Sequence, residues 1–374
     1  MSPTDLVSHA SMTTRMSCAA RRWVVAACMA ATGCGWQSGE RGSRPSEPGR
    51  TIQPRAGTIV IEGCVPDAGQ TDSLRTARSL GVATDVVLVC AEAGDDGNVH
   101  LLRGTLPETF AAQVSLLHAA GYRVMLGLTY AGGPGATADP AGASKLLADP
   151  KWRGRVTQEL SVIEVDGYEL AFPQLVNGSR GDVLSFAKTL SAKARPARTV
   201  GIFTPPSISE PSDLPGGDAY DLPALRPYSD RFRLMTLDFS CCGAGPGPTI
   251  DPLWAASAVR AATGKVPEGM VDVSVPLYGV HFWELHEQYV SHAEAASLAV
   301  HHDATIQRTD LLVPHFTFSQ SGSIHEVWFD DQVSILSHLA SWKPVVVPAP
   351  VGVVYYGIGG EDGGLWPAIA EARP

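Results

Sequence analysis

The length, composition and charge of the chain limit the classes of protein to which it can belong. It has 374 residues, of which 44% are hydrophobic and 18% are charged, so it can bury a sizeable core. Its formal net charge is −10, whereas a surface that binds nucleic acid needs positive charge. The sequence therefore favours a globular domain and argues against a nucleic-acid partner.

Residues 1–34 are typical of an export signal. Arg21 and Arg22 precede the apolar run 23–31, and small residues lead from it to Cys34. The segment resembles a bacterial lipoprotein signal, which would attach a lipid to Cys34 and place the protein in the cell envelope. The alternative is a cleaved signal without lipid, which would give a secreted protein. Elsewhere the apolar runs are shorter than a membrane-spanning helix, so we expect membrane contact through the N-terminal anchor alone.

The rest of the chain divides into a linker and a folded domain. Residues 35–56 are rich in Gly, Ser, Pro and Arg, so we expect a disordered linker. Over 57–374, apolar runs of strand length alternate with helical stretches such as 107–120, 181–194 and 252–263. This alternation predicts a (β/α)8 TIM barrel, an α/β fold whose active-site residues lie at the C-terminal ends of the strands. The expected strands are Thr58–Cys64, Asp85–Ala91, Arg123–Tyr130, Ser161–Phe172, Thr199–Pro205, Phe232–Ser240, Val271–Tyr278 and Val351–Gly357.

The fourth expected strand carries the most informative stretch, which runs Val-Asp-Gly-Tyr-Glu-Leu-Ala-Phe-Pro-Gln from Val165. It resembles the signature of glycoside hydrolase family 18, the chitinase-like enzymes, in which Asp-Gly is followed by acids at alternate positions. The residues that match are Asp166, Gly167 and Phe172. Glu169 substitutes for one acid, but Ala171 stands where the next acid is expected and Pro173 where the catalytic Glu is expected.

The resemblance implies a chemistry that these two replacements impair. In this family the N-acetyl group of the substrate attacks the sugar carbon, while a Glu protonates the leaving oxygen and an Asp orients the acetamido group. Proline has no proton to give and alanine has no charge. A positioned general acid contributes on the order of 10²–10⁴ in rate. Rescue by Glu169 or Gln174 after a register shift is the alternative, although an amide cannot supply the proton.

Further motifs extend the resemblance over residues 57–370. The form of one of them, His-Glu-Val-Trp-Phe-Asp-Asp from His325, is characteristic of the spore-cortex and peptidoglycan N-acetylglucosaminidase branch of the family. The resemblance therefore implies a glycan that contains N-acetylglucosamine. The other matching motifs are Ala131-Gly132-Gly133, Met235-Thr236-Leu237-Asp238, Pro276-Leu277-Tyr278-Gly279 and Gly352-Val353-Val354-Tyr355-Tyr356.

The candidate substrate-binding residues are Asp238, Tyr278, Trp283 and Tyr356. The resemblance implies that Asp238 contacts the reacting sugar, and the alternative is a loop cap. Tyrosine rings offer flat faces on which a sugar can stack, and the alternative is that they close the core. Asp238 and Glu284 are also candidates for a replacement catalytic carboxylate. A solvated loop residue is the other interpretation of Glu284.

Other polar residues are expected to have structural roles. We expect Asp331 to cap the helix that follows it and Trp328 to pack beneath that helix, with Asp330 part of the same architecture. Seven of the eleven histidines lie between 281 and 325, but they lack the spacing of a metal site, and the family needs no metal or other cofactor.

The cysteines give a hint about compartment. Cys64 and Cys90 end neighbouring expected strands, so in an exported protein they can form a disulfide or remain thiols. Cys241 and Cys242 are adjacent in the sequence and are expected to be thiols, because a disulfide between neighbours is strained.

Three functional hypotheses follow. The first is an exported monomer that binds peptidoglycan or a chitin-like glycan with little or no hydrolysis. The second is an active glycosidase that uses a displaced carboxylate, namely Glu169, Glu284 or Asp238. The third is a non-catalytic scaffold whose barrel rim binds another envelope protein.

Overall fold

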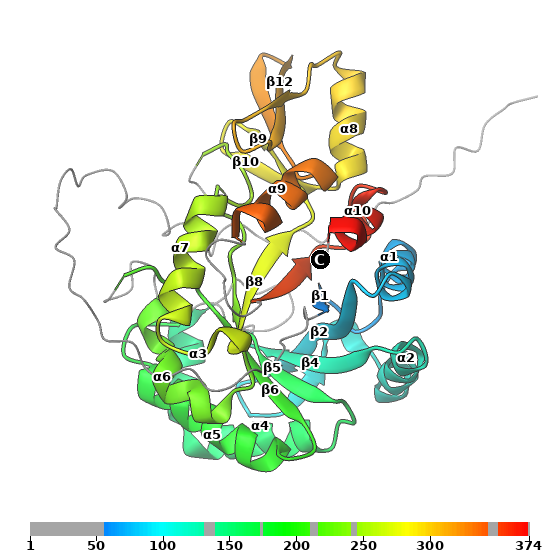
Figure 1. Cartoon of the computed structure of the whole chain (residues 1–374). Coiled ribbons are helices and arrows are strands. Elements are labelled where there is room, and N and C mark those ends of the chain that lie inside the picture. The colour runs from blue at the N-terminus through cyan, green and yellow to red at the C-terminus, as the bar shows by residue number, and fades with distance from the viewer. Residues whose placement is uncertain are drawn as a thin grey trace, which may run out of the picture.

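The computed structural model describes residues 56–130, 139–172, 175–209, 216–240, 245–342 and 351–372. Eight parallel strands form a closed barrel, because β1 pairs with both β14 and β2. The (β/α)8 barrel predicted from the sequence is therefore confirmed (Figure 1). The barrel strands are β1 (Gly57–Ile61), β2 (Ala83–Ala93), β4 (Arg123–Thr129), β5 (Gly167–Leu170), β6 (Thr199–Thr204), β7 (Arg231–Leu234), β8 (Val271–Pro276) and β14 (Gly352–Tyr356).

Most of the helices surround the barrel, and several begin at a side-chain cap. Asp67 and Gln70 form a capping box at the start of the first helix. Asp251 caps another helix and is followed by Pro252, which suits the first helical position. The helices are α1 (Ala68–Ser79), α2 (Pro107–Ala119), α3 (Pro140–Ala148), α4 (Pro150–Ser161), α5 (Arg180–Ala194), α6 (Leu222–Leu225), α7 (Pro252–Thr263), α8 (His292–His301), α9 (Gln332–Trp342) and α10 (Leu365–Ala372). Short 3-10 turns are η2 (Leu102–Gly104), η3 (Gly217–Ala219), η4 (Arg226–Tyr228) and η5 (Glu268–Met270).

Several expected strand boundaries are wrong, and two of them differ most from the structure. The fourth barrel strand begins at Gly167 and not at Ser161, because α4 continues through Ser161. The sixth ends at Leu234 and not at Ser240, so Asp238 lies in the loop after the strand with a left-handed φ of 57°. An acidic residue of this size tolerates that conformation better than a bulky one does.

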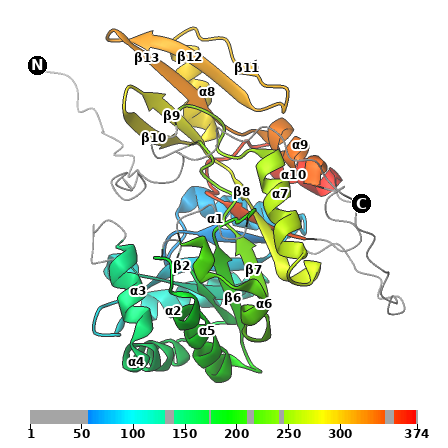
Figure 2. The same ribbon diagram turned by 90° about the vertical axis from the view of Figure 1, so that its left-hand side faces the viewer.

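A five-stranded antiparallel sheet is inserted between β8 and β14, and the sequence interpretation missed it. Its strand order is β10-β9-β13-β12-β11, and it stands above the barrel with α8 on one face (Figure 2). A capping box of Ser291 and Glu294 begins α8, whose buried Ala295 and Ala299 pack against Phe316 and other apolar residues of the sheet. The strands are β9 (Gly279–Trp283), β10 (His286–Val290), β11 (Gln307–Arg308), β12 (Pro314–Gln320) and β13 (Ser323–Trp328), and β3 (Val99–Leu101) is a separate extension of the barrel sheet at β2.

The structure confirms the expected role of Asp331 and places Trp328 in the inserted sheet. Asp331 accepts from the backbone N–H groups of Val333 at 3.1 Å and Ser334 at 3.0 Å, so its role as a helix cap is confirmed. Trp328 lies in β13, where its ring stacks on His315 with 4.3 Å between ring centroids. Its ring contacts a neighbour within the inserted sheet, and packing of Trp328 beneath the helix stays a prediction.

The core has two layers, one on each side of the barrel wall. The larger layer lies between strands and helices, and α5 contributes Phe186 and Leu190 to it. A smaller apolar layer fills the barrel interior and includes Met125, Ala171 and Phe203. The disulfide expected as one possibility is present between Cys64 and Cys90, whose Cα atoms are 5.1 Å apart. No helix in the described ranges is long and apolar enough to cross a bilayer.

Candidate functional site

Two tyrosine–carboxylate pairs form one side of the barrel mouth. Tyr278, two residues after β8, donates its hydroxyl to Asp238 Oδ1 at 2.7 Å. Tyr356, the last residue of β14, donates to the carboxylate of Glu62, which directly follows β1. All four residues lie at or just beyond the C-terminal ends of barrel strands, where active sites of this fold are found. The structure therefore brings three of the predicted residues, Asp238, Tyr278 and Tyr356, to one rim.

The Tyr278 ring packs closely against the backbone at Gly357. A side chain at Gly357 would place its Cβ 2.6 Å from the ring, and Gly357 has a φ of +81°, so glycine is required there. Burial, and after it the negative charge of Asp238, raises the pKa of Tyr278 well above its usual range. The hydroxyl therefore remains a hydrogen-bond donor throughout the neutral pH range.

The aromatic residue of the inserted sheet that reaches this rim is Tyr289, whereas the predicted residue was Trp283. Tyr289 on β10 packs edge-on against Tyr278, with 5.1 Å between ring centroids. Trp283 lies opposite His286, and it stacks on both His286 and His325. Residues 286 and 289 of β10 point to opposite faces of the sheet. Trp283 is therefore on the face away from Tyr289 and does not join the rim tyrosines.

The other candidate acid of the inserted sheet also lies away from the rim tyrosines. Glu284 occupies the turn between β9 and β10, with a left-handed φ of 53°. Its carboxylate accepts from the hydroxyl of Ser323 at 2.5 Å. Glu284 thus links the turns of two neighbouring hairpins of the inserted sheet.

The strand-four residues are divided between the two ends of the barrel. Asp166 precedes β5 and accepts from the backbone N–H of Val124 at 2.7 Å, and its carboxylate also lies 2.8 Å from His118. These partners place Asp166 at the N-terminal end of the barrel, opposite the mouth. Ala171 faces the interior within the apolar layer. Pro173 and Gln174 lie outside the described residues.

Glu169 is engaged inside the barrel. It is 2% exposed, and Arg233 donates to it at 2.7 Å while donating to Asp272 at 2.7 Å through its other terminal nitrogen. Burial raises the pKa of Glu169, and the charge of Arg233 opposes that rise. Its register is continuous, because Glu169 pairs with Gly127 on one side and Gly201 on the other. This arrangement gives no support to a register shift that would bring Glu169 to the mouth.

Known structures match the fold of this chain. The chain matches the spore cortex-lytic enzyme SleL from Bacillus cereus with a TM-score of 0.73 and 18% identity, over 86% of this chain and 76% of that one. It matches a chitinase from Chromobacterium violaceum with a TM-score of 0.72 and 17% identity, over 85% of this chain and 100% of that one. A class V chitinase from Nicotiana tobaccum in complex with NAG4 gives a TM-score of 0.64 at 14% identity, over 85% and 98% of the two chains.

The chain has the fold of the chitinase-like barrels. The resemblance to glycoside hydrolase family 18, including its spore-cortex branch, is thus confirmed at the level of the fold. The sequence matches no protein-family model and no curated protein. Identities below 20% show a shared fold, and the activity of this chitinase-like barrel has to be argued from its own residues.

The sequence interpretation missed two carboxylates of the chitinase-like barrel. Glu62 was not considered because the first strand was expected to continue to Cys64, whereas β1 ends at Ile61. Glu92 was not considered because the second strand was expected to end at Ala91, whereas β2 continues to Ala93. The turn signal Gly-Asp-Asp-Gly that begins at Gly94 could have revealed the extension, since such sequences join paired strands.

The histidines of the inserted sheet take part in aromatic packing. His281 Nε2 and His325 Nδ1 are 2.8 Å apart, and the ring of His302 stacks on Phe318. Burial, with a smaller contribution from His325, lowers the pKa of His281 to about 4. Across the described ranges, no group of three or more His, Cys, Asp or Glu side chains could hold a metal ion.

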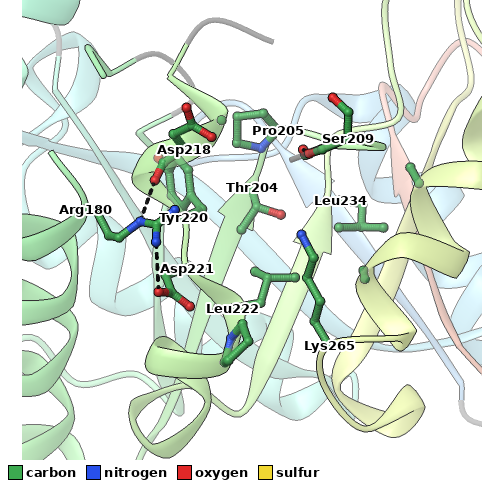
Figure 3. Close-up of a pocket in the computed structure, with 15 residues that line it drawn as sticks. Arg180, Thr204, Pro205, Ser209, Asp218, Tyr220, Asp221, Leu222, Leu234 and Lys265 are labelled. Carbon is green, nitrogen blue, oxygen red and sulfur yellow. Dashed lines mark hydrogen bonds and ion pairs between the residues drawn. The ribbon is translucent and has the colours of Figure 1, made fainter. Parts of the chain in front are cut away.

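A separate cavity of about 510 Å³ lies outside the barrel wall (Figure 3). Residues of the connection from β6 to β7, which contains the four-residue helix α6, line part of it. Arg180 on its edge donates to the Asp218 carbonyl at 3.1 Å and to Asp221 at 3.3 Å. Thr204 lines the cavity with an outward-facing side chain, so the cavity is distinct from the mouth.

Proposed function

We propose that the chain is an exported chitinase-like barrel that binds a glycan containing N-acetylglucosamine at its mouth, with little or no hydrolysis. The observation that carries this proposal is the contrast between the two sides of the mouth. One side keeps hydrogen-bonded tyrosine–carboxylate pairs, Tyr278 with Asp238 and Tyr356 with Glu62. On the other side, directly after β5, the interior position is occupied by the methyl group of Ala171.

The tyrosine pairs suit sugar binding. A sugar ring presents apolar C–H faces and a ring of hydroxyl groups, which match an aromatic surface edged with carboxylate acceptors. Tyr278 and Asp238 are already connected, so their positions are fixed before a ligand arrives. The structure of the Nicotiana tobaccum class V chitinase with NAG4 supports the choice of an N-acetylglucosamine oligomer as the ligand.

The interior of strand β5 supports low hydrolytic activity. Ala171 cannot orient an acetamido group, and Pro173, which lies outside the described residues, cannot protonate a leaving oxygen. Glu169 is already paired with Arg233 below the apolar layer. Asp238 is the predicted carboxylate that remains at the mouth, and the hydroxyl of Tyr278 donates to it.

Peptidoglycan is the ligand we favour, and the cell envelope is the compartment. Two spore cortex-lytic enzymes, from Bacillus cereus and Bacillus megaterium, are among the structural neighbours with TM-scores of 0.73 and 0.71. The Cys64–Cys90 disulfide is consistent with an oxidising compartment outside the cytoplasm. The signal segment and Cys34, which would carry the lipid, lie outside the described residues.

Sedimentation with insoluble peptidoglycan and chitin tests the binding. We expect the full chain to sediment with peptidoglycan and soluble chitotetraose to compete for it. Heat-unfolded protein and an acidic protein of similar size serve as controls for trapping. Recovery of the folded chain entirely in the supernatant, with both polymers, would contradict the proposal.

Localisation is tested separately. Metabolic labelling with a palmitate analogue should mark the wild-type chain and leave C34A unlabelled. An unlabelled wild-type chain that is retained inside the cell would overturn the proposed export.

A further inference from the structure

Strand β2 contains a bulge close to the mouth. Val89 pairs with Gly127 on β4, but the next pair is Ala91 with Leu128, so Cys90 is an extra residue in β2. A bulge reverses which side chains face each side of a sheet. Val87 and Val89 belong to the interior layer before the bulge.

After the bulge, Glu92 turns toward the barrel interior. Ala91 and Ala93 are fully buried in the outer layer, between the barrel wall and the helices. Because side chains alternate along a strand, Glu92 lies on the opposite, interior side. Without the extra residue it would point out toward the helices.

The register places Glu92 at the height of Ala171. Glu92 pairs with Thr129, and Leu128 pairs with Leu170 one position lower. The N–H of Ala171 donates to the carbonyl of Leu128 at 2.8 Å, so Thr129 and Ala171 stand at the same level. Neighbouring strands are about 4.8 Å apart, which puts the backbones of Glu92 and Ala171 roughly 10 Å apart. At this level Thr129 and Ala171 both have shorter side chains than Glu92.

A disulfide and a close backbone contact with β4 hold the bulge in place. The bulge residue Cys90 forms the disulfide with Cys64, which lies in the segment after β1. Gly127 lets the bulged strand approach β4, since a Cβ at this position would lie 2.9 Å from the Cα of Val89. The disulfide therefore fixes the backbone two residues before Glu92.

Glu92 lies in a partly buried environment. His100 is its partner across β2 and β3, and the hydroxyl of nearby Tyr130 donates to Asp95 at 3.0 Å. Burial raises the pKa of Glu92, and the charge of His100 opposes that rise. Glu92 in turn contributes to the raised pKa of Tyr130, together with Asp95 and Asp139.

We propose that Glu92 is the carboxylate that contacts the bound sugar from this side of the mouth, in place of the one that strand β5 lacks at Ala171. The Cys64–Cys90 disulfide acts as a positioning element, because it fixes the bulge that turns Glu92 inward. This inference rests on the proposed glycan binding. It adds a carboxylate on β2, which is next to β1 with its Tyr356–Glu62 pair and lies across the barrel from β7, which leads to Asp238 and its partner Tyr278.

Isothermal titration with chitotetraose tests the role of Glu92. We expect E92Q to bind roughly ten-fold or more weakly than wild type, because a hydrogen bond to a charged acceptor is lost. E108Q, on the exposed face of α2, is the matched control and should bind as wild type does. Equal affinities of E92Q and wild type would overturn the inference, whereas a wild-type chain that binds no glycan would overturn the proposed function itself.

A double-mutant cycle tests the disulfide. The change C64S/C90S should weaken binding in the wild-type background and have no further effect in the E92Q background, since its influence passes through Glu92. If C64S/C90S weakens binding equally in both backgrounds, the disulfide has a general structural role, and the proposal that it positions Glu92 is overturned. If C64S/C90S fails to fold, mild reduction of folded wild type and E92Q gives the same comparison.

Discussion

Arg233 and Glu169 form an ion pair inside the barrel, with 2.7 Å between Nη2 and Oε1 and each side chain 2% exposed. Arg233 also holds Asp272 at 2.7 Å through its other terminal nitrogen. One guanidinium thus pairs with two buried carboxylates beneath the apolar layer. The pair explains why Glu169, which substitutes for one acid of the family signature, is not available at the mouth.

Removing Arg233 should destabilise the barrel strongly. R233M leaves Glu169 and Asp272 buried without their counter-charge, and breaking such a pair costs about 3–5 kcal/mol. Urea denaturation should show this loss, and E169Q, which removes one charge and keeps an acceptor oxygen, should lose less. A midpoint for R233M equal to that of wild type would contradict the assigned network.

Gly201 should be required by Glu169. A Cβ at position 201 would lie 1.9 Å from Glu169 Oε2, so G201A must displace the buried carboxylate. We expect a loss of about 1–3 kcal/mol in the free energy of unfolding, the usual cost of overpacking. G181A is the matched control, because no atom lies within 4 Å of a Cβ there. Equal losses from the two variants would refute this contact.

The hydroxyl of Tyr278 should contribute to glycan affinity. Y278F removes the bond to Asp238 and leaves that carboxylate free to change position, so we expect chitotetraose to bind roughly ten-fold more weakly. Y122F is the control, since Tyr122 donates to the Leu74 carbonyl at 2.6 Å on the helix side of the barrel. Y122F should lower the melting temperature and leave the affinity of the folded protein unchanged. The opposite outcome, an unchanged affinity in Y278F, would remove Tyr278 from the site.

Acid should destabilise the inserted sheet through His281. Its pKa is lowered to about 4 in the folded protein, mainly by burial. Between pH 4 and the ordinary pKa of 6.5, the unfolded chain therefore binds more protons than the folded protein does. The contribution to stability is therefore complete above pH 6.5 and falls as the pH drops toward 4, by on the order of 2 kcal/mol. Thermal unfolding of wild type and H281Q at pH 7, 5.5 and 4.5 checks this. A parallel decline in both proteins would exclude His281 as the cause.

The sequence predicted the barrel because its strands are buried on both faces and appear as continuous apolar runs. It could not show which face each residue takes where the chain departs from regular pairing. Cys90 illustrates this, because one extra residue in β2 reverses the direction of Glu92. Bulges depend on long-range register, which apolar patterns in a single strand do not record.

The inserted sheet limited the prediction of the site in a similar way. Its strands are short and rich in histidine, so they lack the apolar runs that identified the barrel strands. Trp283 was predicted at the mouth from its place after the seventh strand, but the register of β9 turns it toward His325. Asp238, Tyr278 and Tyr356 were predicted as substrate-binding residues, and the structure places all three at or just beyond the C-terminal ends of barrel strands. Their contact with a substrate stays a prediction.

Release of reducing ends from chitotetraose and peptidoglycan by the full chain tests the central claim most directly, with the Chromobacterium violaceum chitinase as a positive control. The account predicts that the chain binds the oligosaccharide and releases sugar no faster than a blank, or only marginally so. Turnover at a rate comparable to that of the control enzyme would contradict it.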